Sequence, residues 1–286
     1  MMKRIGAVLA AALLAAGLAG CIQAPAEPFG TAPTEHTEHF EVEELYVHRG
    51  DMEIYGKLYL PGAYEGKLPA VILSHSSDLT ADSMKSYCER LAGMGYAAYA
   101  FDFCGGSKKS RSSGDAADMT VFTEAEDLKA VLAAIRELDC VDEQSIYLFG
   151  TSQGGLVSAL VADECPDEVK GLILFYPAFN TAELIQSFYG DRNETPGEPY
   201  IQTLLDYDVY EHIGAFPGDV LILHGSRDFI VPSSYSQRAA ELYAHCELYL
   251  IEGAYHGFNA ENYVRWGDHD QETWAYVEDY LAAHEG

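Results

Sequence analysis

The segment Gly150-Thr151-Ser152-Gln153-Gly154 carries the residues best suited to chemistry. An apolar run ends just before it, and small residues with helical spacing begin just after it. In a strand-to-helix turn of the form G-x-S-x-G the serine hydroxyl is exposed, and glycine avoids the collisions that β-carbons would cause. A serine that only caps a helix does not need glycine on both sides. The pattern therefore predicts that Ser152 is a nucleophile.

A serine hydroxyl needs a base to take its proton and an acid to orient that base. Asp228 follows the apolar run "DVLILHG", and His256 follows the run "CELYLIEG". Side chains at the carboxyl ends of parallel strands lie at one edge of a sheet. We therefore predict that Ser152, Asp228 and His256 converge there as nucleophile, acid and base.

Other acids and histidines fit these roles less well. Asp219 opens a strand-like run, and Asp206 and Asp208 lie in a long gap between runs. His224 precedes a glycine at a strand end, so we interpret it as a packed turn residue. His245 has the position of a solvated helix end.

The rest of the pattern predicts an α/β fold that could position these residues. Short apolar runs typical of buried parallel strands occupy residues 69–75, 96–103, 145–150, 171–177, 219–225 and 246–253. Helical periodicity occupies residues 83–94, 121–138, 153–163, 233–244 and 271–283. Such alternation predicts a mostly parallel, doubly wound sheet. Before it, residues 40–61 alternate apolar and polar side chains around Arg49-Gly50-Asp51, as an antiparallel hairpin does.

One gap between the predicted strands is unusually long. The segment from about residue 179 to residue 216 is rich in phenylalanine and tyrosine. A structureless loop of this length is improbable in a compact domain. We predict a small cap over the carboxyl ends of the strands.

From Phe40 to the C-terminus the chain resembles the α/β-hydrolase superfamily, and within it the cinnamoyl/feruloyl esterase-type carboxylesterases. The resemblance rests on the G-x-S-x-G elbow with Gln153 after the serine, on the order Ser, Asp, His, and on the small aromatic gap. It implies cleavage of carboxylic esters with short-chain or aromatic acyl groups, without a cofactor. Ser152 would attack the ester, His256 would move the proton, and Asp228 would fix the His256 tautomer.

The resemblance also implies an oxyanion hole made of two backbone N–H groups, those of Gln153 and Ser77. Relatives carry glycine where this chain has Ser76, and they carry a longer D-x-x-G-H-G-x-S motif after the residue that matches Asp102. We interpret the shorter segment as a reduced rim loop. Cys104 in it is expected to be structural, because no second base is placed beside it.

Two other function classes share parts of this pattern. A serine peptidase of the oligopeptidase type has the same triad order but normally adds a propeller domain, for which the chain has no room. A non-catalytic surface-binding lipoprotein would have no reason to keep all three triad residues. Dienelactone-type hydrolases usually carry cysteine at position 152. No metal site is expected, because the five cysteines after Cys21 show no C-x-x-C spacing.

The first 39 residues do not fit the domain. Lys3 and Arg4 precede an Ala/Leu run that ends in "LAGC", which resembles a bacterial lipoprotein signal. We predict a signal peptide over residues 1–20, lipidation of Cys21 and a flexible tether over residues 21–39; a plain secretory signal is the alternative. This places the domain in the cell envelope outside the cytoplasm, with the membrane reached through the lipid anchor.

The chain is strongly acidic. Its formal charge is −28, and removal of Lys3 and Arg4 makes it −30. Such a charge disfavours binding to nucleic acid and to anionic membrane surfaces. No nucleic-acid partner is therefore expected, and the resemblance implies a small ester substrate as the partner.

Overall fold

The computed structural model describes residues 35–36, 40–179, 198–205, 207–258 and 269–284. The predicted signal peptide and Cys21 lie outside the described residues, as does most of the tether. No helix of the described segments is long and apolar enough to cross a membrane.

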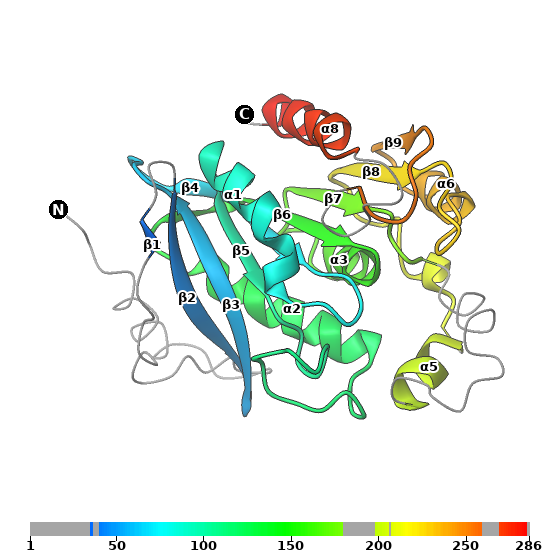
Figure 1. The fold of residues 1–286 in the computed structure, drawn as a ribbon, viewed down its shortest axis with the longest axis horizontal. Helices are drawn as coiled ribbons and strands as arrows, with labels where there is room; N and C mark the ends of the chain where they lie inside the picture. The colour runs from blue at the N-terminus through cyan, green and yellow to red at the C-terminus, as the bar shows by residue number, and fades with distance from the viewer. Residues whose placement is uncertain (1–34, 37–39, 180–197, 206, 259–268, 285–286) are drawn as a thin grey trace.

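A mixed nine-stranded sheet runs through the described part of the chain, in the order β1-β2-β3-β5-β4-β6-β7-β8-β9 (Figure 1). From β5 onward along this order every neighbouring pair is parallel. The parallel strands are β4 (Leu68–Ser74), β5 (Ala97–Phe101), β6 (Val141–Thr151), β7 (Gly171–Phe175), β8 (Asp219–Gly225) and β9 (Cys246–Ile251). All six predicted runs are therefore strands of one sheet, and the predicted α/β-hydrolase fold class is confirmed.

The predicted hairpin is also present. Strands β2 (Phe40–Arg49) and β3 (Met52–Pro61) pair antiparallel, and β3 joins β5 antiparallel. Within the segment predicted as a tether, the two-residue strand β1 (Glu35–His36) pairs antiparallel with β2. A two-residue edge strand is held by backbone hydrogen bonds and is too short to show alternating apolar and polar side chains in the sequence.

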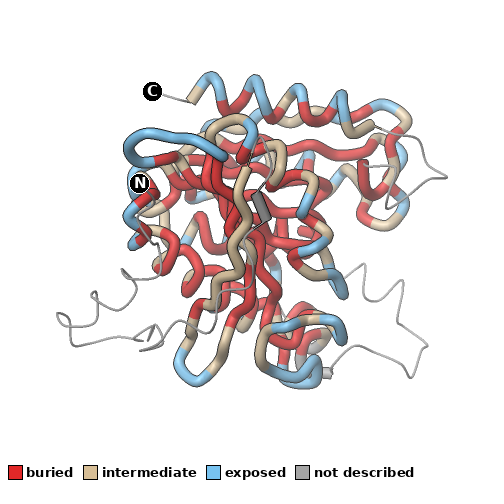
Figure 2. The backbone as a smooth tube through the Cα atoms, turned by 60° about the vertical axis from the view of Figure 1, so that its left-hand side comes forward, coloured by how far each residue is buried: buried red, intermediate tan, exposed pale blue. Residues whose placement is uncertain are grey.

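Helices cover both faces of the sheet. They are α1 (Lys85–Gly93), α2 (Val121–Arg136), α3 (Gln153–Glu164), α5 (Glu198–Leu205), α6 (Ser234–Ala240) and α8 (Asp270–Ala283). Alternate residues of β7 belong to different cores: Leu172 and Leu174 pack with α2 and α3, whereas Ile173 and Phe175 pack with α1 and α8. The central strands are accordingly buried over most of their length, while α8 alternates buried and exposed residues (Figure 2).

Only part of the predicted cap is described, because residues 180–197 and 206 lie outside the described residues. The described part includes α5 and the short 3-10 helix η4 (Val209–Glu211). Its aromatic residues Phe179, Tyr200, Tyr210 and Phe216 are buried in the same core as α2 and α3. These four side chains therefore contribute to the packing of the domain.

Candidate active site

The turn between β6 and α3 holds Ser152 in an unusual backbone conformation. Its φ of 51° and ψ of −115° are rare for a residue with a β-carbon. A β-carbon at Gly150 would lie 2.3 Å from the Gly154 carbonyl oxygen, and one at Gly154 would lie 2.2 Å from the Ser74 carbonyl oxygen. Both glycines are therefore required by close backbone contacts, as expected for a nucleophile elbow.

The end of β7 holds this strained turn from the other side. The Ser152 N–H donates to the Phe175 carbonyl at 2.9 Å, and the Ala178 N–H donates to the Ser152 carbonyl at 3.0 Å. The Ser152 carbonyl also accepts the Gly155 N–H inside α3. Hydrogen bonds on both sides of the residue fix the backbone that carries the hydroxyl.

The structure brings Ser152, His256 and Asp228 together. The Ser152 Oγ lies 3.0 Å from His256 Nε2, and His256 Nδ1 lies 2.7 Å from Asp228 Oδ2. Each residue follows a different strand, namely β6, β9 and β8. Because the carboxylate accepts, His256 Nδ1 carries the proton and Nε2 is free to accept the serine proton. This arrangement can activate the serine hydroxyl for attack on a carbonyl carbon.

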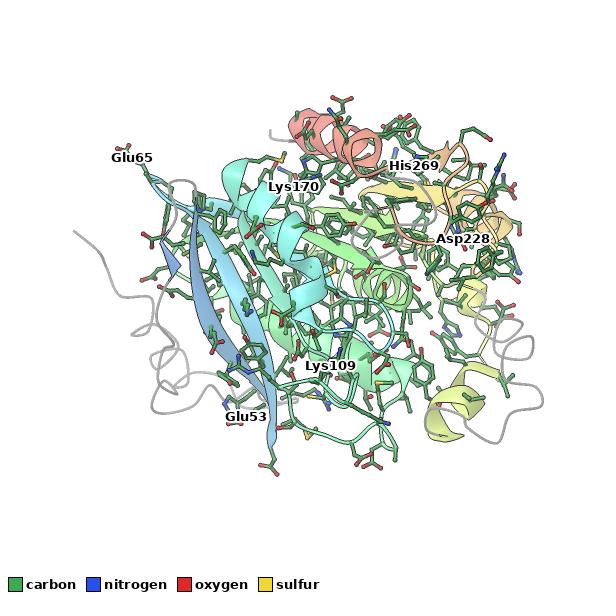
Figure 3. All side chains as sticks on the ribbon, in the orientation of Figure 1. Glu53, Glu65, Lys109, Lys170, Asp228 and His269 are labelled. Carbon is green, nitrogen blue, oxygen red and sulfur yellow. The ribbon has the colours of Figure 1, made fainter. Side chains whose placement is uncertain are left out.

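Asp228, which is labelled in Figure 3, follows β8 and is buried. Burial by itself would raise its pKa, but hydrogen bonds from His224, His256 and the Val231 N–H outweigh it. The pKa of Asp228 is therefore lowered to about 2. A carboxylate that stays ionised at this point can accept the His256 Nδ1–H and so hold the imidazole in one orientation.

His256 has a second ring beside it. The Tyr176 ring lies 4.6 Å from the imidazole, centroid to centroid, at an interplanar angle of 59°. Tyr176 adopts a φ of 39°, another strained value, directly after β7. The same strand end therefore supports both the elbow and the imidazole.

Gln153, one of the two predicted oxyanion donors, is the first residue of α3. Backbone N–H groups in the first turn of a helix have no partner within that helix, so they can receive a developing negative charge. The Gln153 side chain is buried and its amide donates to Glu124 Oε1 at 2.6 Å. The Gln153 side chain is thus anchored to α2.

Ser77, the other predicted donor, lies in the loop after β4. The preceding Ser76 carbonyl accepts from His75 Nδ1 at 2.8 Å and from the Leu79 N–H at 3.2 Å. In a trans peptide the C=O and N–H point in opposite directions, so the Ser77 N–H points away from both groups. Ser76, where relatives have glycine, places its hydroxyl 2.9 Å from Thr151 Oγ1 beside the elbow. The Ser76 hydroxyl therefore ties this loop to the end of β6, directly before Ser152.

The short segment after β5 supports the same loop. Asp102 is buried and accepts the Ala81 N–H at 2.7 Å through one oxygen and the Arg111 N–H at 2.8 Å through the other. Cys104 lies in this segment with its N–H donating to Asp127. Burial raises the pKa of the Cys104 thiol, so the thiolate is disfavoured and a structural role fits.

Two buried polar residues near the triad were not predicted as part of the site. Glu124 on α2 contacts Gln153, and His224 at the end of β8 lies 3.2 Å from Asp228. An acid among apolar residues on the inner face of α2 is one sequence signal for a buried polar contact. The spacing of four residues between His224 and Asp228 is a second signal, here for contact between two polar side chains near one strand end. In the described part of the chain, no group of three or more His, Cys, Asp or Glu side chains is arranged to hold a metal ion.

Comparison with known proteins agrees with this architecture. The protein Est1E of Butyrivibrio proteoclasticus, solved with ferulic acid bound, is 25% identical with a TM-score of 0.71, covering 84% of this chain and 98% of that one. The acetyl xylan esterase of Paenibacillus sp. R4 is 16% identical with a TM-score of 0.68, covering 87% of both chains. The chain has the α/β-hydrolase fold.

Comparisons of sequence add two further matches. The family described as serine aminopeptidase, S33, matches residues 67–193, a segment that contains Ser152 but ends before Asp228 and His256. An uncharacterized protein of Mycobacterium tuberculosis is 27% identical over 210 residues, covering 73% of this chain and 69% of that protein. This chain is therefore similar in structure to esterase-like hydrolases and in sequence to a family named for a peptidase.

Proposed function

We propose that this protein is a serine hydrolase that cleaves carboxylic esters with short-chain or aromatic acyl groups. The observation that carries the proposal is the buried hydrogen-bond chain from the Ser152 Oγ through His256 to Asp228, set on a strained elbow. A serine in this conformation, with a base at 3.0 Å and an ionised acid behind it, has the parts that acyl transfer requires.

In the proposed reaction the Ser152 Oγ attacks the ester carbonyl carbon while His256 Nε2 takes the hydroxyl proton. The N–H groups of Gln153 and Ser77 hold the oxyanion of the tetrahedral intermediate. The intermediate collapses, the bond to the alcohol oxygen breaks, and His256 gives its proton to that oxygen. Water then repeats the sequence on the acyl-enzyme, which releases the acid and restores Ser152.

The choice of an ester rests on the structural neighbours. Est1E binds ferulic acid, and others of similar fold are named acetyl xylan esterases. The second candidate is cleavage of a peptide bond at an N-terminus, which the name of the matching S33 family favours. Both reactions use the same triad, so the leaving group that the site accepts distinguishes them.

The location of the reaction is part of the proposal. The "LAGC" segment supports lipidation of Cys21, which would anchor the domain to a membrane outside the cytoplasm. The partner at the membrane would then be lipid, reached through acyl chains on one cysteine. Metabolic labelling of the cells with a fatty-acid analogue should mark the wild-type protein and leave a Cys21→Ser variant unmarked.

The test of function is a substrate panel. Purified protein is assayed with p-nitrophenyl esters of increasing acyl length, with methyl ferulate, and with aminoacyl p-nitroanilides. We expect hydrolysis of one or both kinds of ester, negligible release from the anilides, and no ester activity in Ser152→Ala. Faster cleavage of the anilides would support the peptidase instead, and ester hydrolysis by Ser152→Ala would remove the proposed nucleophile.

A further inference from the structure

A second histidine contacts the acid of the triad. His224 is fully buried at the end of β8, and its Nε2 lies 3.2 Å from Asp228 Oδ2 and 2.8 Å from the Val231 carbonyl oxygen. Its Nδ1 lies 2.7 Å from Ser236 Oγ on α6. The proposed reaction uses none of these contacts directly.

The neighbours of His224 determine where its proton lies. The Val231 carbonyl can only accept a hydrogen bond, so the His224 Nε2 must carry a proton. That N–H points between the Val231 carbonyl and the Asp228 carboxylate. When Nδ1 is unprotonated it accepts the proton of the buried Ser236 hydroxyl. A neutral ring thus satisfies both nitrogens and the serine at once.

The His224 N–H is one of four that surround the Asp228 carboxylate. Oδ1 accepts the backbone N–H groups of Ile230 and Val231, each at 2.9 Å. Oδ2 accepts His256 Nδ1 at 2.7 Å and His224 Nε2 at 3.2 Å. The two histidines therefore share one oxygen. The backbone donors fix the other oxygen, so the carboxylate has little freedom to rotate.

Val231 links His224 and Asp228 a second time. Its N–H donates to Asp228 Oδ1, and its carbonyl accepts from the same His224 nitrogen that faces Oδ2. A movement of the His224 ring would therefore disturb both oxygens of the carboxylate. Loss of the ring's N–H would leave Oδ2 held by His256 alone.

We propose that His224 is a positioning residue for the reaction, a neutral imidazole whose Nε2–H holds Asp228 Oδ2 in the orientation that receives the His256 Nδ1–H. This inference rests on the proposed function. His224 would act through Asp228, because its own contacts are with Asp228, Val231 and Ser236. Loss of this hydrogen bond to a charged group is expected to lower kcat about 10- to 100-fold.

Two substitutions of His224 separate this role from simple packing. The amide nitrogen of His224→Gln can lie near the position of Nε2, whereas that of His224→Asn lies near Nδ1. His224→Asn should lower kcat about 10- to 100-fold with little change in KM, because it keeps a group near Ser236 but loses the donor to Asp228. His224→Gln should recover most of the loss. Ser236→Ala is the matched control, since it alters only the far side of the ring, and its kcat loss should be the smallest of the three.

A readout that does not depend on activity is the proton resonance of His256 Nδ1–H in the purified protein. A proton in a short hydrogen bond to a carboxylate resonates far downfield. It should be present in the wild type and in Ser152→Ala, weakened or shifted in His224→Asn, and restored in His224→Gln. This signal tests the proposal even if the wild-type protein does not hydrolyse esters, so failure of the function and failure of the inference are distinguishable.

Several results would overturn the inference. One is a folded His224→Asn protein that keeps the wild-type kcat and the wild-type His256 resonance while only its melting temperature falls, because that describes packing alone. Nitrogen-15 shifts of the wild-type protein that place no proton on His224 Nε2, or protons on both of its nitrogens, would contradict the neutral tautomer. This second measurement needs no variant, so it decides the matter if His224→Asn does not fold.

Discussion

Two buried carboxyl groups contact residues of the candidate active site, Asp228 through His256 and Glu124 through Gln153, and their surroundings differ sharply. Asp228 accepts four N–H groups and has its pKa lowered to about 2. Glu124 accepts one amide N–H from Gln153, and its Oε2 has no hydrogen-bond partner among the described residues. Burial raises the pKa of Glu124, and the nearby charge of Asp127 raises it further. The hydrogen bond from Gln153 lowers it, and the resulting pKa is about 8.

The difference shows that hydrogen-bond donors, more than burial, set the charge of these acids. Both side chains are removed from water, which disfavours the ionised form of each. Four donors restore the charge of Asp228, where the proposed reaction needs an anion beside His256. One donor leaves Glu124 protonated at neutral pH, next to the residue proposed to stabilise an oxyanion. A second negative charge there would oppose the one that develops on the substrate.

The largest predicted effect is the difference in kcat between a variant of Asp228 and a variant of Glu124. Asp228→Asn is expected to lower kcat roughly 10⁴-fold, because an amide can hold His256 in the wrong tautomer. Glu124→Gln should lower it less than about tenfold, because an amide can still hydrogen-bond Gln153 and is neutral like the protonated acid. Steady-state kinetics with one activated ester measures both.

Both substitutions preserve the shape of the side chain, so each serves as the control for the other. Circular dichroism and melting temperatures establish that the compared proteins are folded. Losses of equal size in the two variants would contradict the contrast between the acids. Near-wild-type activity in Asp228→Asn would mean that another carboxylate orients His256.

The next effect concerns stability at neutral and alkaline pH. The folded-state pKa of Glu124 is above its unfolded value, so between about pH 5 and pH 8 the native state binds one more proton than the unfolded chain. The contribution of Glu124 to the free energy of unfolding therefore falls as pH rises, by about 1.4 kcal/mol per pH unit and roughly 5 kcal/mol in total.

Glu124→Gln removes this proton and should flatten that fall. Urea unfolding of the wild type and the variant at pH 5, 6.5 and 8 measures the difference, which should grow steadily with pH in favour of the variant. A difference that is constant across these pH values would show that Glu124 is ionised in the folded protein throughout.

The smallest effect lies at acid pH and has the opposite sign. Because the pKa of Asp228 is depressed in the folded state, its stabilisation is fully present above about pH 4. It is lost as pH falls from there through about 2 and amounts to about 2 kcal/mol. Unfolding between pH 4.5 and 2.5 should therefore be less steeply pH-dependent in Asp228→Asn than in the wild type. Parallel curves for the two proteins would contradict the assigned ionisation.

The strands and the elbow could be predicted from the sequence because each has a local signature. Apolar runs marked the buried strands, and glycines on both sides of Ser152 reflected contacts below 2.5 Å from a β-carbon at either position. The order of Asp228 and His256 after two strand ends placed them at one edge of the sheet. These features are encoded within a few residues of where they act.

The partners of the two buried acids could not be predicted in this way. Glu124 meets Gln153 only because α2 packs on α3, 29 residues apart in sequence. His224 has the local pattern of a packed turn residue, and it is packed, but its contact with Asp228 depends on how the turn after β8 folds back. Such contacts depend on tertiary packing, for which one sequence holds no periodic signal.

The central claim is that Ser152 is the nucleophile, and covalent labelling tests it most directly. The purified protein is treated with a fluorophosphonate, and intact mass followed by peptide mapping locates the adduct. We expect one adduct per chain, on Ser152, with loss of ester hydrolysis in proportion to labelling and no adduct in Ser152→Ala. An adduct on another residue, or an active protein that takes up none, would contradict the account.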